Sequence, residues 1–120
     1  MMAKSLLRLL AIAAGTILAG NAGAADLGIY RSASCFSYAQ STLPAEPVET
    51  IKQTLWNNFQ DAEAGMNDPR VQGARQPAFV WAMETRWACT AAIGYLDGGH
   101  LDEESVQKCD CFHQRYMSLR

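Results

Sequence analysis

Apolar residues recur at every third or fourth position over much of this chain, the spacing that places them on one face of an α-helix. The pattern is clearest after Pro47, where the apolar positions form one stripe made of Val48, Ile51, Leu55, Phe59 and Ala62. Pro47 suits a first helical position, and Gly65 suits the residue just past a helix end. We therefore predict a helix between these two residues.

Two further helical segments flank this one along the chain. Residues 32–42 predict a first helix of about three turns, which the proline-containing stretch 43–47 ends. Pro77 opens a longer segment that is apolar nearly all round as far as Leu96, and a helix of that kind belongs in the middle of a bundle. Residues 66–76 lie between the helix that follows Pro47 and the segment that Pro77 opens. They contain a proline, a glycine and several turn formers, so we expect a loop with about one helical turn.

The ends of a last helix are marked by their residue types. Residues 97–100, Asp-Gly-Gly-His, form a tight stop, and Asp102 is a suitable N-cap for the helix that follows. Glu103 and Glu104 lie in its first turn, where the helix dipole favours negative charge. No segment alternates convincingly between apolar and polar residues, which is the pattern of a strand. The sequence thus predicts an all-α fold, a small bundle of about four helices.

The first 25 residues have the composition of a cleaved secretory signal peptide. Lys4 and Arg8 form a short basic region, and the apolar stretch 6–18 is shorter than the ~20 residues that span a bilayer. Small residues at 22–24 predict cleavage after Ala24 or Ala25. The expected product is one helical domain over residues 26–120.

This leader predicts where the protein works. Asn21 occupies the position at which a bacterial lipoprotein would carry its lipidated cysteine, so we expect no lipid anchor. The mature chain is expected in a bacterial periplasm or outside the cell, with no stable attachment to the membrane. An even number of cysteines in such a small exported domain predicts disulfide bonds.

The charge balance argues against nucleic-acid binding. The chain holds 10 Lys and Arg against 12 Asp and Glu, and two of the basic residues belong to the leader. Its arginines are scattered singly, whereas DNA- and RNA-binding proteins gather basic residues on one face. A mildly acidic protein is suited instead to a basic partner.

The spacing of the four cysteines favours one pairing. Cys109 and Cys111 leave a helix about 200° apart, so they should not bond to each other. In an antiparallel hairpin that turns at Gly98 and Gly99, Cys89 lies level with Cys109, which leaves Cys111 for Cys35. The swapped pairing, Cys89 with Cys111 and Cys35 with Cys109, stays open.

The cluster Cys109, Cys111 and His113, with His100 nearby in sequence, suggests an alternative as a periplasmic metal or redox carrier. Two thiolates and an imidazole would suit a soft ion such as Cu(I), but only if both cysteines stay reduced. The spacing matches neither the usual zinc motifs nor haem attachment. The chain also lacks a Gly-rich phosphate loop and a Gly-x-Ser-x-Gly motif, so we expect no enzyme activity and no cofactor.

Binding to another protein is the remaining kind of function. Exposed aromatic residues beside irregular segments are typical of binding hot spots. The expected exposed aromatics are Trp56 on the edge of the second helix and Trp81 at the start of the third, and the irregular segments are the 66–76 loop beside Trp81 and the 97–100 turn. The candidate contact residues are Trp56, Met66, Asp68, Arg70, Trp81, Asp97 and His100.

One short run resembles a known family. Residues 89–98 read Cys-x-x-x-x-Gly-Tyr-Leu-x-Gly, and this run, with the leader, the helical domain and the cysteines, resembles the periplasmic immunity proteins of type VI secreted amidase effectors. The resemblance implies a helical protein that blocks a cell-wall hydrolase by plugging its cleft with a loop or helix end. The predicted function is therefore an inhibitor or immunity factor acting on a hydrolase or toxin. An accessory subunit of an envelope complex is an alternative.

Overall fold

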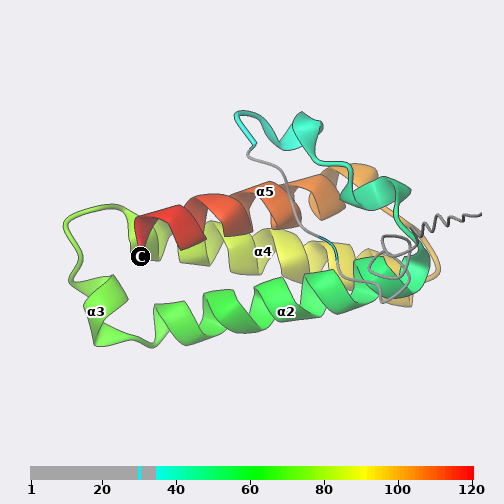
Figure 1. Ribbon diagram of the computed structural model, residues 1–120. Coiled ribbons are helices and arrows are strands. Elements are labelled where there is room, and N and C mark those ends of the chain that lie inside the picture. The colour runs from blue at the N-terminus through cyan, green and yellow to red at the C-terminus, as the bar shows by residue number, and fades with distance from the viewer. Residues whose placement is uncertain (1–29, 31–34) are drawn as a thin grey trace, which may run out of the picture.

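The computed structural model describes residue 30 and residues 35–120. This part is helical and contains no strand. Three long helices, α2 (Val48–Met66), α4 (Ala78–Asp97) and α5 (Glu103–Leu119), lie side by side, and the short helices lie before α2 or between α2 and α4 (Figure 1). In chain order the elements are η1 (Tyr38–Gln40), η2 (Leu43–Ala45), α2 (Val48–Met66), α3 (Pro69–Gln72), α4 (Ala78–Asp97) and α5 (Glu103–Leu119).

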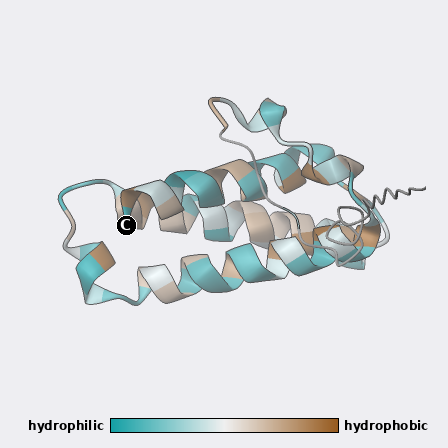
Figure 2. Ribbon diagram, in the orientation of Figure 1, coloured by the Kyte–Doolittle hydropathy of each residue, from teal (hydrophilic) through white to brown (hydrophobic). Residues whose placement is uncertain are grey.

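The core forms where the apolar faces of the three long helices meet, and Figure 2 shows hydrophobic residues on all of them. Its larger cluster includes Ile51 and Leu55 of α2, Cys89 of α4 and Val106 of α5, all buried. A smaller cluster near α3 packs Val71 and Ala82 against Tyr116. Burying a side chain of the size of Ile or Leu contributes about 2 kcal/mol to folding. This burial holds together helices that would be marginal alone.

The ends of α2 differ from the prediction. Pro47 is the N-cap and not the first helical residue, and the helix continues through Gly65 to Met66. Gly65 is inside the helix because α2 meets α5 there: a Cβ at this position would overlap the Tyr116 hydroxyl group. The glycine therefore permits a close approach of two helices instead of ending one.

The predicted helix over residues 32–42 is wrong for its described part. Residues 32–34 lie outside the described residues, and η1 is a single 3-10 turn. Ser37 caps this turn, and the Gln40 side chain accepts hydrogen bonds from the backbone N–H groups of Phe36 and Ser37. Side-chain bonds of this kind compete with a continuous helix, which explains why serine-rich segments favour turns.

Two disulfides attach α5 to the rest of the fold, and they are the pairing that the spacing favours. Cys89 of α4 is bonded to Cys109, and Cys35 of the N-terminal segment is bonded to Cys111. The first bond closes a loop of 20 residues in sequence separation, which is worth about 3 kcal/mol in the chain-entropy account. Disulfides of this kind indicate a non-cytoplasmic protein.

A tight turn joins α4 to α5, as residues 97–100 predict. Gly99 adopts a φ of 84°, the left-handed conformation that glycine favours, and the His100 N–H donates to the Tyr95 carbonyl. The Asp102 carboxylate then accepts from the Ser105 N–H and caps α5. Among the described helices, none is both long enough and apolar enough to cross a membrane.

Candidate functional site

The outer face of α4 is an apolar surface that no other described helix covers. Val80, Trp87, Ala91 and Tyr95 recur at helical spacing and lie on the side of α4 opposite the buried Cys89. Trp87 is 70% exposed, Tyr95 50% and Val80 45%. We call these four residues the α4 ridge. Exposed apolar residues gathered on one face mark an interaction site more often than scattered ones.

A groove of about 380 Å³ runs beside the α4 ridge, between α4 and α5. Its wall on α4 carries Trp87, Ala91 and Tyr95, and Glu84 lies at one end. The wall on α5 is mainly polar, with Phe112 as its one large apolar residue, and no residue of α2 lines the groove. Its residues from α5 and the preceding turn are Asp102, Glu104, Ser105, Lys108 and Phe112.

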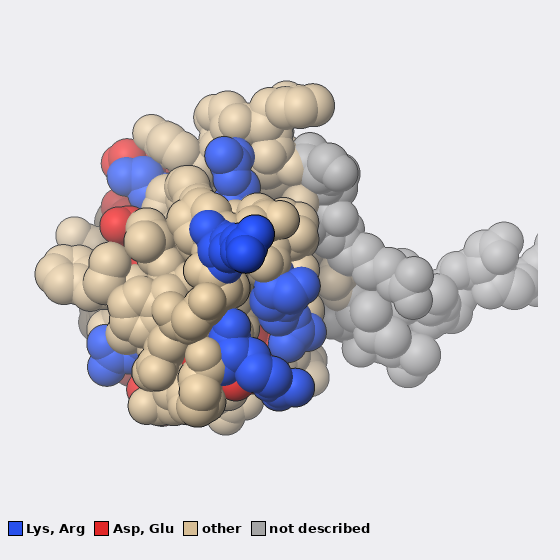
Figure 3. All heavy atoms as spheres, turned by 90° about the vertical axis from the view of Figure 1, so that its left-hand side faces the viewer, with Lys and Arg blue, Asp and Glu red and all other residues tan. Residues whose placement is uncertain are grey.

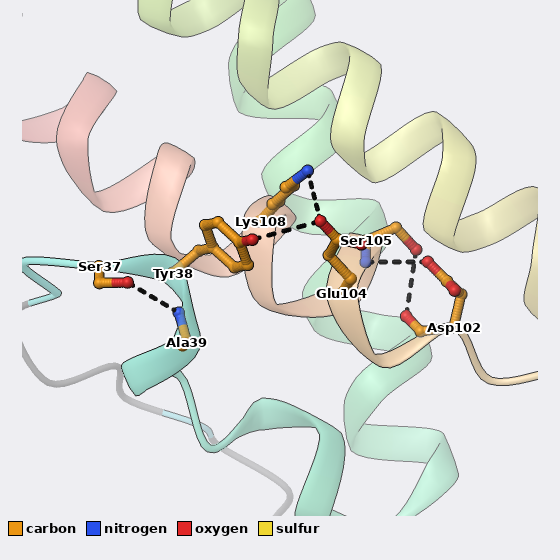
Figure 4. A network of polar contacts seen from close by, with 7 residues as sticks. All are labelled: Ser37, Tyr38, Ala39, Asp102, Glu104, Ser105 and Lys108. Carbon is orange, nitrogen blue, oxygen red and sulfur yellow. Dashed lines mark hydrogen bonds and ion pairs between the residues drawn. The ribbon is translucent and has the colours of Figure 1, made fainter.

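Polar contacts hold the α5 wall in place (Figure 4). The Lys108 ammonium group lies 2.8 Å from the Glu104 carboxylate, and the Tyr38 hydroxyl donates to the same carboxylate over 3.3 Å. The hydrogen bond from Lys108 lowers the pKa of Glu104 and raises the pKa of Lys108. Hydrogen bonds with the Ser105 side chain and backbone likewise lower the pKa of Asp102. Both carboxylates are therefore ionised at neutral pH.

The two ends of the bundle differ in charge. Figure 3 shows Lys and Arg side chains gathered at the end where α3 and the C-terminus lie. Arg70 and Arg120 line a cavity of about 380 Å³ at this end. The opposite end holds the α4–α5 turn with the acidic run at 102–104 and Asp97. The acidic end adjoins the groove, whereas the basic end lies at the other end of α4.

The predicted contact residues do not form one site. Met66, Asp68, Arg70 and Trp81 lie at the α3 end, while Asp97 and His100 lie in the α4–α5 turn. Trp81 and Asp97 are 16 positions apart on α4, which corresponds to about 24 Å at 1.5 Å per residue. A partner could contact both groups only by spanning the length of the bundle.

Several of these residues have structural roles. Asp68 caps α3 through the Arg70 N–H at 2.9 Å and also pairs with the Arg70 guanidinium at 3.1 Å, which lowers the pKa of the Asp68 carboxyl. Met66 packs against the smaller core cluster. Trp81 is half-buried, with the Phe112 ring 5.4 Å away and the Arg115 guanidinium 4.9 Å from its ring centre. Trp81 is thus a packing residue and not a free aromatic anchor.

Trp56 and the α4–α5 turn are more accessible. Trp56 is 49% exposed on α2, edge-on to Phe59 at 5.6 Å, and does not line the groove. The exposed His100 ring lies 5.7 Å from that of Tyr95. His100 of the turn therefore adjoins Tyr95 of the α4 ridge, whereas Trp56 is on a different helix.

Sequence reasoning missed Trp87 and Tyr95, which are exposed on α4 and were not among the predicted contact residues. The predicted cysteine pairing was sufficient to identify them from the sequence. Once Cys89 is assigned to the α5 side of its helix, a residue two positions away points about 200° from it. Trp87 meets that condition, as does Ala91, and Tyr95 follows one turn later.

The suggested metal ligands are not brought together as a set. Cys109 and Cys111 are each committed to a different disulfide. The His113 Nε2 atom lies 2.8 Å from an Asp61 carboxylate oxygen, which links α5 to α2. With both disulfides formed, Cys109 and Cys111 cannot act as a pair of thiolate ligands.

Sequence reasoning also missed the role of Asp110, which is only 1% exposed. Its carboxylate accepts hydrogen bonds from the Ser41 and Tyr30 hydroxyl groups, the latter over 3.1 Å. These contacts tie the N-terminal segment to α5 beside the Cys35–Cys111 bond. The role of Asp110 is therefore structural, because the Ser41 and Tyr30 hydroxyl groups supply hydrogen-bond donors to its buried carboxylate.

Comparison of the chain with models of protein families, with curated proteins and with solved structures found no match.

Proposed function

We propose that this is an exported helical protein that binds another protein, as an inhibitor or immunity factor that blocks a cell-envelope hydrolase or toxin. The observation that carries the proposal is the α4 ridge. Large aromatic residues that stay exposed on a rigid helix bury much apolar area on binding at a small cost in side-chain entropy. Such a surface contributes shape and apolar area, which is what an inhibitor needs.

Other features support the setting of this function. The leader-like residues 1–25 favour export to the bacterial periplasm, and two disulfides are compatible with that compartment. The run from Cys89 to Gly98, which carries the resemblance to immunity proteins of amidase effectors, contains Tyr95 of the ridge. The surface and the resemblance therefore direct attention to the same stretch of chain.

A photo-crosslinking experiment in the bacterium that produces the protein tests the proposal. A photoreactive phenylalanine analogue replaces Trp87, and in a matched control it replaces Gln53, an exposed residue on the outer side of α2. We expect one envelope protein to be crosslinked from position 87 and not from position 53. Purified, that protein should degrade cell wall or another envelope component, and adding the wild-type chain should inhibit it stoichiometrically.

The variant Trp87→Ala separates binding from folding. Because Trp87 is largely exposed, its removal should leave the melting temperature nearly unchanged, yet inhibition should weaken at least tenfold. Equal crosslinking from both positions would contradict the proposed surface. A specific partner whose activity is unaffected by the chain would favour an accessory subunit instead.

A further inference from the structure

The groove beside the α4 ridge has two chemically different walls. Trp87, Ala91 and Tyr95 make the wall on α4 mainly apolar, with Glu84 at one end, whereas Asp102, Glu104 and Lys108 make the opposite wall mainly charged. A ligand that fills such a groove must itself be apolar along one side and polar along the other. An amphipathic helix has this property over its whole length.

The length of the groove corresponds to about three turns of helix. Its lining extends along α4 from Glu84 to Tyr95, 11 residues apart, which corresponds to about 16 Å. Small residues, Ala88, Ala91 and Ser105, lie between the larger ones and allow a close approach. Since α2 packs against α4 and α5 but does not line the groove, a helix placed there would add a fourth long member to the bundle.

The charges of the lining residues specify the sign of the ligand. Three carboxylates, on Glu84, Asp102 and Glu104, face one ammonium group, on Lys108. That ammonium is already paired with Glu104 at 2.8 Å. The groove therefore keeps an excess of negative charge, which favours Lys or Arg on the ligand.

We propose that the groove between α4 and α5 receives an amphipathic helix of the partner, with its apolar side against the α4 ridge and its Lys or Arg residues against Glu84, Asp102 and Glu104. This inference rests on the proposed function, because it describes the partner that the inhibitor would bind. The mode is helix-in-groove recognition, in which apolar residues at helical spacing supply the contact area and flanking charges supply selectivity.

The same charges argue against a second copy of this chain as the occupant. Two grooves placed face to face would bring the carboxylates of one copy toward those of the other. Like charges at an interface disfavour association. A partner helix with basic residues avoids that repulsion and neutralises the lining.

Two synthetic peptides test this inference on the purified full-length mature chain. Both are 14-residue helices with the same leucine stripe, and their polar face carries Lys in one and Glu in the other. Binding is followed by shifts of backbone amide NMR signals during titration. We expect the Lys peptide to bind at least tenfold more tightly than the Glu peptide, with shifts in α4 and α5 and not in α2.

Charge reversal provides the matched variants. Glu84→Lys should remove most of the preference for the Lys peptide, while Glu49→Lys, on the exposed first turn of α2, should leave it unchanged. Equal binding of the two peptides, or shifts centred on α2, would overturn the inference. Shifts of the α4 signals on raising the protein concentration without peptide would assign the groove to a second copy, which also overturns it.

The outcomes also separate this inference from the proposed function. Selective peptide binding without any crosslinked hydrolase or toxin in cells would keep the groove and reject the inhibitor role. An inhibited hydrolase with no preference for the Lys peptide would keep the role and reject the basic helix.

Discussion

The two faces of α4 are both apolar, yet they are built from different residues. The face toward α2 and α5 carries mostly small residues, among them Ala82, Cys89 and Ala92, and is buried. The face toward solvent carries the large side chains of Trp87 and Tyr95. Small residues let neighbouring helices approach closely, whereas large exposed aromatics leave apolar area free for another surface. The first face serves folding, and the second is the surface on which the proposed binding function rests.

The largest expected difference in stability is between two variants. One loses a large side chain from the core, and the other loses a large side chain from the exposed face of α4. Leu55→Ala empties part of the core that α2 forms against α4, and should reduce the free energy of unfolding by about 2–5 kcal/mol. Trp87→Ala removes a larger side chain from the open face and should change the free energy of unfolding by less than about 0.5 kcal/mol. Urea unfolding followed by circular dichroism measures both. A similar loss in the two variants would show that the α4 ridge is part of the core.

Two glycines within helices allow a smaller and more closely matched comparison. Gly65→Ala places a methyl group against Tyr116 and should destabilise the fold by about 1–3 kcal/mol. Gly94→Ala adds the same methyl group on the open side of α4. There, no atom of the described residues beyond the adjoining turns of α4 lies within 4 Å of the new Cβ, so the change should stabilise the fold by about 0.5–1 kcal/mol. Thermal melts at neutral pH distinguish the signs. A loss of stability in Gly94→Ala would mean that the open face is crowded.

The smallest effect is expected at the acidic rim of the groove. Because folding lowers the pKa of Asp102, its ionised cap adds stability above the ordinary carboxyl pKa of about 4, and this stability is lost as the pH falls through the lowered pKa. Asp102→Asn keeps a neutral cap and should flatten this acid dependence. Melting temperatures at pH 7 and pH 3 give the comparison. An identical loss in wild type and variant would exclude Asp102 as a source of acid sensitivity.

Local patterns were sufficient to predict much of the fold. The apolar stripe from Val48 to Ala62 and the cap at Asp102 placed α2 and the start of α5 close to where they lie. The antiparallel turn at Gly98 and Gly99 led to the favoured disulfide pairing, because helical geometry fixes which residues face each other. Export by a leader and the likeness to immunity proteins remain predictions.

The candidate site was predicted less well because it depends on which faces are covered. Residues 66–76 and 97–100 were expected near partners as irregular segments, but Asp68 and Arg70 serve the α3 cap. Trp81 and Trp87 occur on the same apolar helix, and sequence did not separate the half-buried one from the exposed one. The orientation of α4 about its own axis, relative to the helices it packs against, determines how much of each tryptophan is buried.

The sequence by itself determined the three long helices, their order and the cysteine geometry, since these follow from spacings and end signals within short stretches of chain. Only the tertiary structure decided that Gly65 lies against Tyr116, that Asp110 is buried and that Trp87 is exposed. These properties depend on contacts between residues far apart in sequence. Hydrophobic burial favours covering every apolar face of a helix. Where the neighbouring helices pack decides which face of α4 stays exposed.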